Sequence, residues 1–266
     1  MAQTAMAGPR RVEVDDVDVL WPPEVARPGG DALTRELLHG SGVDAGARVV
    51  QLAPGTGATV RRVLEIGPRT FVVVAPGATT TRILGRVAPA AEVVTASPGA
   101  TGLDDGAASA VIAEGLVTCT PPEGHEAIVA EAARLLRAGG RLGLHELCLW
   151  PGDAPGETAA ATRALADVGV HPLGPDAWRG LLRAGGLVPV GATTGPQVAR
   201  SNADVFRELG PRGALAVLEA LGRDRRAAQR SLAARTAVER HRRHLAAIVV
   251  IGEKPLIAGI RRPSAA

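Results

Sequence analysis

The feature that most constrains this chain is a short apolar segment, Val49–Leu52, that runs into a glycine-containing turn, Ala53–Gly57, and then directly into a helical pattern. A buried strand that passes through glycines into a helix brings backbone N–H groups close to a ligand at the helix N-terminus. Gly55 and Gly57 suit this turn because a Cβ atom would hinder positive φ angles or block the ligand. A dinucleotide-binding fingerprint would need a third glycine where the chain has Val60. The turn therefore predicts a ligand-binding α/β sheet and argues against an NAD site.

Segments with strand and helix patterns alternate along the chain. Strands are expected at residues 48–52, 70–75, 91–95, 108–113, 141–149, 187–193 and 246–251. Helices are expected at residues 31–38, 125–136, 156–167 and 175–184 and over most of 201–245, with Asp31 as the N-cap of the first. Strands separated by helices of this length predict a parallel sheet with right-handed crossovers.

One folded domain accounts for this pattern, because the chain shows no internal repeat and no long linker. Residues 1–29 are polar and proline-rich, and we expect a loose N-terminal arm there with Trp21 as its apolar contact point. Residues 30–255 are expected to form the domain, with a helical cap inserted at about 195–245, and residues 256–266 a C-terminal tail.

Charge and cysteine content narrow the classes of function. The net charge is only +3 and aromatic residues make up 2% of the chain, which argues against a nucleic-acid partner. Cys119 and Cys148 lie far apart without a C-x-x-C motif, as in reduced cytoplasmic proteins. No apolar run approaches the ~18 residues of a membrane span, and the first residues lack a signal-peptide core. We therefore expect a soluble cytoplasmic protein without a membrane partner; a homo-oligomer stays open.

Several stretches, taken in order, resemble the class I S-adenosylmethionine (SAM)-dependent methyltransferases, in particular actinobacterial enzymes of the small-molecule type. The stretches are the glycine turn with Gly55 and Gly57, Arg27–Gly30 with Leu33 and Thr34, Glu114, Leu135–Arg141, His145–Leu147, Pro172 with Leu173, Trp178 with Arg179, and Leu181 with Leu182. The resemblance implies a Rossmann-like, seven-stranded methyltransferase sheet, mostly parallel with the last strand antiparallel, helices on both faces and a helical cap. It also implies SAM as the cofactor and a small-molecule substrate from secondary metabolism.

The departures from that family lie at the positions that hold the cofactor. Gln51 stands where the family keeps an acid for the SAM ammonium group, and Ala53 replaces the first glycine of the turn. Ala75 stands at the acid that binds the ribose hydroxyls, and Ser97 at the acid that contacts the adenine. The resemblance thus assigns cofactor contacts to these four positions and to the two later glycines, but without the carboxylates.

The loss of these acids predicts weak cofactor binding. A charged hydrogen bond contributes ~1.5–3 kcal/mol, so losing two such contacts predicts SAM binding roughly 10²–10⁴-fold weaker than in an intact relative. Two functions stay open. The first is SAM-dependent methyl transfer to a small molecule with weakened cofactor contacts. The second is a repurposed methyltransferase fold that transfers no methyl group and serves as an isomerase, cyclase or lyase, or only binds a ligand or partner.

Three polar residues are expected at the carboxyl ends of the fourth and fifth strands, where open α/β sheets bind ligands. Glu114 could orient a substrate or accept its proton, and His145 could act as a general base. Glu146 follows directly, and a regular strand would direct the side chains of His145 and Glu146 to opposite faces, so that at most one meets the ligand. The structural alternatives are that Glu114 caps the next helix and that His145 bridges sheet and helix by hydrogen bonds.

The arginine-rich segment 223–243 is a further candidate site. A solvated face of a cap helix explains it, and contact with an acidic substrate or an anionic partner is the alternative. His241 and His244 lie three residues apart, but among so many arginines they fit a solvated helix face better than a metal site.

Overall fold

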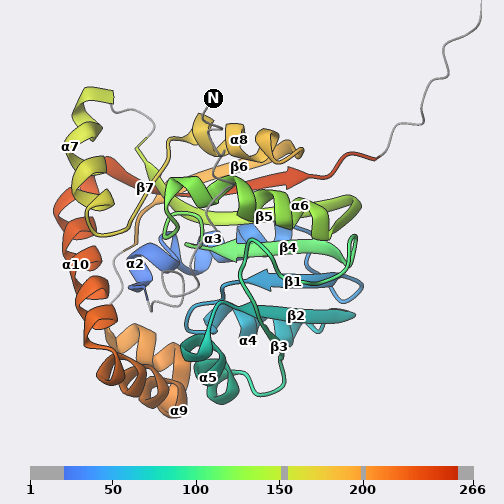
Figure 1. Ribbon diagram of the computed structural model, residues 1–266, viewed down its shortest axis with the longest axis horizontal. Coiled ribbons are helices and arrows are strands. Elements are labelled where there is room, and N and C mark those ends of the chain that lie inside the picture. Colours follow the sequence, from blue (N-terminus) through green and yellow to red (C-terminus); the bar gives the residue numbers. More distant parts are fainter. Residues whose placement is uncertain (1–20, 151–154, 199–201, 257–266) are drawn as a thin grey trace, which may run out of the picture.

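The computed structural model describes residues 21–150, 155–198 and 202–256 and arranges them around one seven-stranded sheet (Figure 1). The strands are β1 (Arg48–Leu52), β2 (Thr70–Ala75), β3 (Glu92–Thr95), β4 (Ala108–Glu114), β5 (Leu136–Leu149), β6 (Val188–Pro196) and β7 (Leu245–Glu253). Their order is β3-β2-β1-β4-β5-β7-β6, and β7 runs antiparallel to both neighbours whereas the other pairs are parallel. The predicted mostly parallel sheet with an antiparallel last strand is confirmed.

Helices cover both faces of the sheet, as the sequence predicts. They are α2 (Pro23–Ala26), α3 (Gly30–Gly40), α4 (Ala58–Ile66), α5 (Ala78–Val87), α6 (His125–Leu135), α7 (Pro155–Ala166), α8 (Pro175–Ala184), α9 (Asn202–Arg223) and α10 (Arg225–His241). Side chains of α3, α4 and α5, among them Leu37, Val60 and Leu84, pack on one face. Side chains of α6 and α8, among them Ile128 and Trp178, pack on the other. Because both faces are covered, the central strands are continuous apolar runs instead of alternating ones.

Several predicted boundaries move by a few residues in the structure, and the largest shift at the start of a strand is in β5. β5 begins at Leu136 and not at residue 141, because the Gly139 N–H donates to the carbonyl of Lys254 and extends the ladder. Asp31 does not act as the predicted N-cap: α3 begins one residue earlier without a side-chain cap, and the Asp31 carboxylate pairs with Arg27 at 2.7 Å.

The end of the expected N-terminal arm is packed against the domain. Residues 1–20 lie outside the described residues, but residues 22–29 form α2 and a turn at the edge of the sheet. Val25 is buried in the core, and the Val198 N–H donates to the Pro28 carbonyl at 2.7 Å. The prediction of a loose arm is therefore wrong for residues 22–29, whose backbone and side chains have partners in the domain.

The cap helices α9 and α10 follow β6 and lie along the edge at which β1 and β4 end (Figure 1). α9 changes direction at Gly210, whose φ of 69° is not helical, and packs on α5 through Leu209 and Ala216. α10 packs on α2 and α7, so α2 lies between the sheet edge and the cap. Within the described ranges, no helix combines the length and apolar character needed to cross a membrane.

Candidate functional site

The glycine turn after β1 keeps a backbone suited to ligand binding. Gly55 and Gly57 have left-handed φ angles of 56° and 83°. The left-handed conformation favours glycine at Gly57, and a Cβ atom there would lie 2.9 Å from the Leu84 side chain of α5, which would have to shift. Ala53 has a positive φ of 43°. This conformation costs an L-residue roughly 1–2 kcal/mol. The turn is thus preserved although alanine occupies its first position.

Gln51, Ala75 and Ser97 stand where the resemblance predicts acids that contact SAM. All three lie at the same sheet edge, and none carries a carboxylate. Gln51 is buried near the end of β1, and its Oε1 has no hydrogen-bond partner among the described residues. Ala75 is buried in the core at the end of β2. Ser97 lies just after β3 and pairs through its backbone with Ala100. These three positions therefore supply no negative charge for SAM.

Helix α2 sits directly on the end of β4. A Cβ atom on Gly115, which has a φ of 62°, would lie 2.6 Å from the Ala26 Cα atom and 2.7 Å from the Val25 carbonyl oxygen. Ala53, Gly55 and Glu114 line the cavity that remains beside the turn, and Trp21 and Ala26 border it. That cavity measures about 30 Å³. Such a volume matches roughly one water molecule.

Glu114 is the centre of a buried polar cluster at this edge. Its side chain is 6% exposed, with the Arg27 guanidinium at 3.7 Å. Its carboxylate accepts hydrogen bonds from the hydroxyls of Thr34 (2.6 Å) and Thr59 and from Nδ1 of His145 (2.9 Å). Burial would raise the pKa of Glu114, but the hydrogen bond from His145 and the charge of Arg27 outweigh it and lower the pKa to about 2. Glu114 is therefore ionised and engaged within the protein.

Arg27 connects this cluster to the cap. Its guanidinium donates to Glu208 of α9 at 2.6 Å, to Asp31 at 2.7 Å and to the Thr34 hydroxyl at 3.2 Å. The sequence gives no local sign of this role of Arg27, because its partner Glu208 lies 181 residues away. A buried arginine with carboxylates from several elements fixes those elements relative to one another.

Both ring nitrogens of His145 are occupied. Nδ1 faces the Glu114 carboxylate, and Nε2 accepts a hydrogen bond from the Gly29 N–H at 2.9 Å. Since Nε2 is an acceptor, Nδ1 carries the proton and the imidazole is neutral. The side chain is fully buried, so in this arrangement it has no lone pair for a substrate proton. His145 therefore anchors the segment before α3. This is the alternative role in which His145 bridges sheet and helix by hydrogen bonds.

Glu146 holds the loop after β4. Its buried carboxylate accepts hydrogen bonds from the backbone N–H groups of Val117 (3.1 Å) and Thr118 (3.0 Å). Burial raises the pKa of Glu146 to about 7 although these hydrogen bonds oppose the shift. Burial, with the charge of Glu146, also raises the pKa of the nearby Cys119 thiol well above its usual value. The thiol is therefore protonated and a poor nucleophile.

Two larger cavities flank Trp21 beneath the cap. The first, here called the α2–cap cavity, measures about 270 Å³ and lies between α2, the glycine turn, α9 and α10. The second, here called the α10 cavity, measures about 730 Å³ and lies between α10 and the loops after β4 and α7. The cap thus encloses space for a ligand even though the cleft at the glycine turn is closed.

The lining of the α2–cap cavity is mainly apolar. The apolar lining residues are Pro22, Pro23, Ala26, Ala58, Val205, Phe206, Val217, Leu218, Leu221, Ala228 and Leu232. Leu218 and Leu232 are 53% and 66% exposed and give the cavity an apolar entrance. The ion pair between Arg27 and Glu208 and the side chain of Arg235 supply its charged groups. Apolar walls with a few placed polar groups are typical of small-molecule sites.

Comparison with solved structures identifies the fold. The MccD protein matches with a TM-score of 0.62 and 12% identity, over 86% of this chain and 99% of that chain. The [4+2]-cyclase SpnF matches with a TM-score of 0.60 and 16% identity, over 85% of this chain and 81% of that chain. A geranyl diphosphate methyltransferase in complex with SAM matches with a TM-score of 0.56 and 16% identity, over 84% of each chain. No protein-family model and no curated protein matches the sequence. The chain has the class I SAM-dependent methyltransferase fold.

This fold implies SAM at the glycine turn, and the residues found there do not fit it. The remaining cavity of about 30 Å³ is an order of magnitude too small for a nucleoside ligand. The positions for the ribose and adenine contacts carry Ala75 and Ser97. The acids that the edge does carry, Glu114 and Glu146, bind groups of the protein itself.

The contact between α2 and Gly115 can be tested by adding a methyl group. Gly115→Ala should destabilise the protein by ~2 kcal/mol or more, because the backbone clash adds to the strain of a positive φ. Gly102→Ala is the matched control, since Gly102 has a φ of 74° and no atom within 4 Å of an added Cβ. Urea unfolding should show the larger loss for Gly115→Ala; equal losses would mean that α2 is not seated on Gly115.

The low pKa of Glu114 predicts a specific acid sensitivity. The folded pKa of about 2 lies below the ordinary value of 4.5, so this carboxylate stabilises the protein above pH 4.5. That stabilisation is lost as the pH falls toward 2, by roughly 3 kcal/mol for Glu114 alone. Glu114→Gln should remove this part of the pH dependence, as measured by urea unfolding between pH 5 and pH 2.

Glu131→Gln provides the control, because the hydrogen bond from Arg134 helps to lower the pKa of Glu131 to about 2 as well. The Glu131 variant should retain the Glu114 contribution. If Glu114→Gln unfolds with the same pH dependence as the wild type, the buried cluster around Glu114 does not exist as described.

Proposed function

We propose that this protein binds a small, mainly apolar molecule in the α2–cap cavity and does not take a methyl group from SAM. The observation that carries the proposal is the backbone contact between α2 and Gly115, which closes the cleft where the fold would hold a nucleoside. The mainly apolar lining of the α2–cap cavity, next to the closed cleft, supports the choice of ligand.

The reaction class that fits is an isomerisation or cyclisation of the bound molecule. Such a reaction needs no second substrate, so a cavity that excludes water and aligns the reacting atoms contributes directly to the rate. SpnF, described as a [4+2]-cyclase, has a similar fold, so a ring-forming reaction is compatible with this fold. Fold similarity alone does not transfer an activity, and the proposal therefore rests on the site.

SAM-dependent methylation of a small molecule is the second candidate. The left-handed backbone at Ala53, Gly55 and Gly57 favours it, because this conformation is costly for alanine and serves ligand approach in related turns. Under this alternative, α2 would have to leave Gly115 when SAM binds. The two candidates therefore differ in cofactor affinity.

Calorimetric titration with SAM and S-adenosylhomocysteine separates the two candidates. We expect no binding heat up to millimolar ligand, because α2 fills the cleft and the carboxylate contacts are missing. A dissociation constant in the low micromolar range would overturn the proposal and establish the second candidate. The variant Gln51→Glu with Ala75→Asp restores two acids and should still show no binding, provided that its melting temperature shows it to be folded.

Binding in the α2–cap cavity can be followed with N-phenyl-1-naphthylamine, a neutral dye that becomes fluorescent in apolar surroundings. Ala228→Phe should fill part of the cavity and weaken dye binding about tenfold or more, as expected for a lost apolar contact of ~1.5–3 kcal/mol. Ala227→Phe, one residue earlier on α10 and outside the cavity lining, should bind the dye like the wild type. Equal affinity in both variants would show that the dye binds elsewhere and would remove the support for this cavity.

A further inference from the structure

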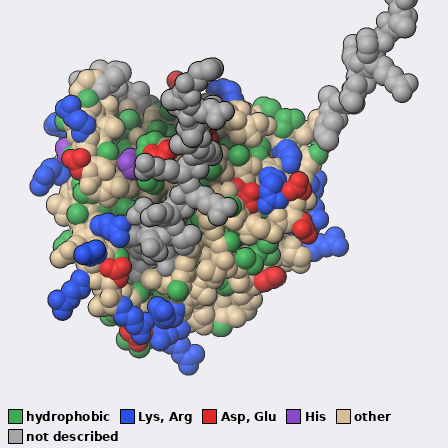
Figure 2. Space-filling view, in the orientation of Figure 1, with side chains coloured by type: hydrophobic (Ala, Val, Ile, Leu, Met, Phe, Trp, Pro, Cys, Tyr) green, Lys and Arg blue, Asp and Glu red, His purple; other side chains and the backbone are tan. Residues whose placement is uncertain are grey.

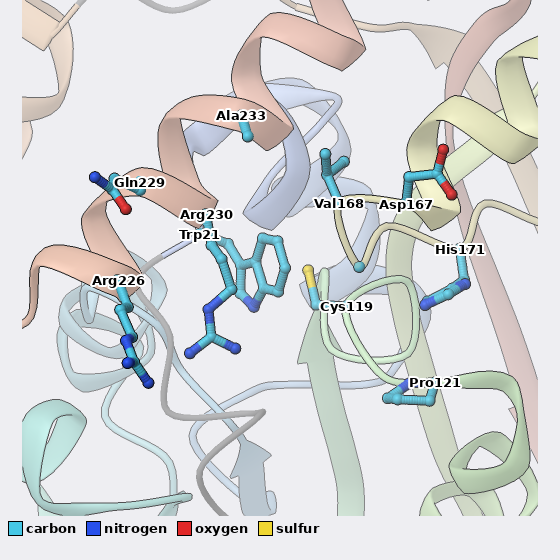
Figure 3. A pocket seen from close by; sticks show the side chains of 11 residues that line it. Trp21, Cys119, Pro121, Asp167, Val168, His171, Arg226, Gln229, Arg230 and Ala233 are labelled. Carbon is cyan, nitrogen blue, oxygen red and sulfur yellow. The ribbon is translucent and has the colours of Figure 1, made fainter.

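Helix α10 borders both cavities beneath the cap and presents a different face to each. Figure 3 shows Arg226, Gln229 and Ala233 of α10 on the wall of the α10 cavity. The residues of α10 that line the α2–cap cavity are Ala228, Ser231, Leu232 and Arg235. Their spacing of three or four residues places them along one stripe of the helix. Within this stripe, Ser231 is the residue with an uncharged hydroxyl group.

The charged groups in the described lining of the α2–cap cavity have partners of opposite sign. They are Arg27, which donates to Glu208 at 2.6 Å, and Arg235, which faces the buried Glu24 carboxylate of α2 at 3.4 Å. Most arginines of α9 and α10 lie outside this lining, and Figure 2 shows basic side chains along the outer edge of the two helices. An ionic ligand would therefore give up its hydration without an unpaired counter-charge to replace it. The lining favours an uncharged ligand.

Two hydroxyl groups of the same cavity differ from these charged groups. Thr56 belongs to the glycine turn and Ser231 to α10, and both residues are partly buried. In the described part of the chain, neither hydroxyl has a hydrogen-bond partner. A hydroxyl can donate one hydrogen bond and accept others. Thr56 and Ser231 can therefore each bind a hydroxyl or a carbonyl oxygen of a ligand.

Filling the cavity changes the surroundings of these hydroxyls. Apolar side chains such as Phe206 and Leu221 make up most of the lining, so the apolar body of a ligand is stabilised there by leaving water. The same ligand excludes solvent from Thr56 and Ser231. A hydroxyl that is removed from water and gains no new partner destabilises the complex. The ligand that fits best therefore has an apolar body and carries an oxygen group toward each hydroxyl.

We propose that the ligand of the α2–cap cavity is an uncharged molecule with two oxygen groups, hydroxyl or carbonyl, on an apolar body. One group bonds to Thr56 at the glycine turn and the other to Ser231 on α10. The cavity of about 270 Å³ lies between these two walls, so the molecule is held at two points and its reacting atoms keep one orientation. This inference rests on the proposed function, since it names the ligand class of the same cavity.

The test uses the full chain and 1,8-octanediol, a flexible uncharged probe whose hydroxyls can adapt to the distance between Thr56 and Ser231. Its dissociation constant comes from displacement of N-phenyl-1-naphthylamine. Ser231→Ala and Thr56→Val should each weaken binding of the diol about threefold to tenfold, the contribution of one neutral hydrogen bond. Binding of the dye itself, which has no oxygen atom, should be unchanged in both variants and thereby show that the cavity is intact.

Two variants on α10 serve as matched controls. Thr236→Val removes a hydroxyl that donates to the Leu232 carbonyl and lies outside the α2–cap lining. Gln229→Ala changes the face of α10 that borders the α10 cavity (Figure 3). Both variants should bind the diol like the wild type. Octanoate, a charged probe with the same number of carbon atoms, should displace the dye less well than the diol.

The outcomes separate this inference from the proposed function. If Ala228→Phe weakens dye binding while Ser231→Ala and Thr56→Val leave the affinity for the diol unchanged, the cavity binds ligands without using the two hydroxyls, and the inference is overturned. Tighter binding of octanoate than of the diol overturns the uncharged class. If Ala228→Phe leaves dye binding unchanged, the proposed function itself fails, and the inference fails with it.

Discussion

The ion pair between Arg27 and Glu114 is the interaction on which the arrangement of this sheet edge depends. Both side chains are buried, so removing Arg27 would leave the Glu114 carboxylate without its cationic partner, typically at a cost of ~3–5 kcal/mol. Arg27 also binds Glu208 of the cap, while Glu114 binds His145, whose other nitrogen accepts from Gly29. The cluster therefore ties α2, the sheet and α9 into one rigid unit and holds α2 over the glycine turn.

This arrangement explains how a methyltransferase fold can be intact while its cofactor site is closed. The seven strands and the left-handed glycine turn are present, so the backbone of the fold is complete. The carboxylates at the ends of β4 and β5 bind other groups of the protein, and the positions expected to contact SAM carry Gln51, Ala75 and Ser97. The space for a ligand lies under the cap instead, on either side of Trp21.

Much of the fold could be predicted from the sequence, because strand and helix periodicity depends on neighbouring residues. The strands 48–52 and 70–75 and the helix 175–184 have the predicted bounds. The chemistry at the sheet edge could not be predicted in this way. His145 was expected to be a candidate base, but its partner Gly29 is 116 residues away, and only the folded chain shows that the imidazole is fully occupied. The packing of residues 22–29 could not be predicted either, because a short proline-rich stretch carries no periodic signal.

Hydrogen exchange of the Gly29 amide, followed by NMR on the ¹⁵N-labelled protein, measures most directly whether this segment is held over the edge. The Gly29 N–H bonds to a buried imidazole, so its exchange should be slowed to a degree comparable with the central amides of β4 and β5, and excess S-adenosylhomocysteine should leave it unchanged. Exchange at the rate of an exposed loop would contradict the account. So would a change in protection on addition of S-adenosylhomocysteine, since the cleft would then open to a nucleoside.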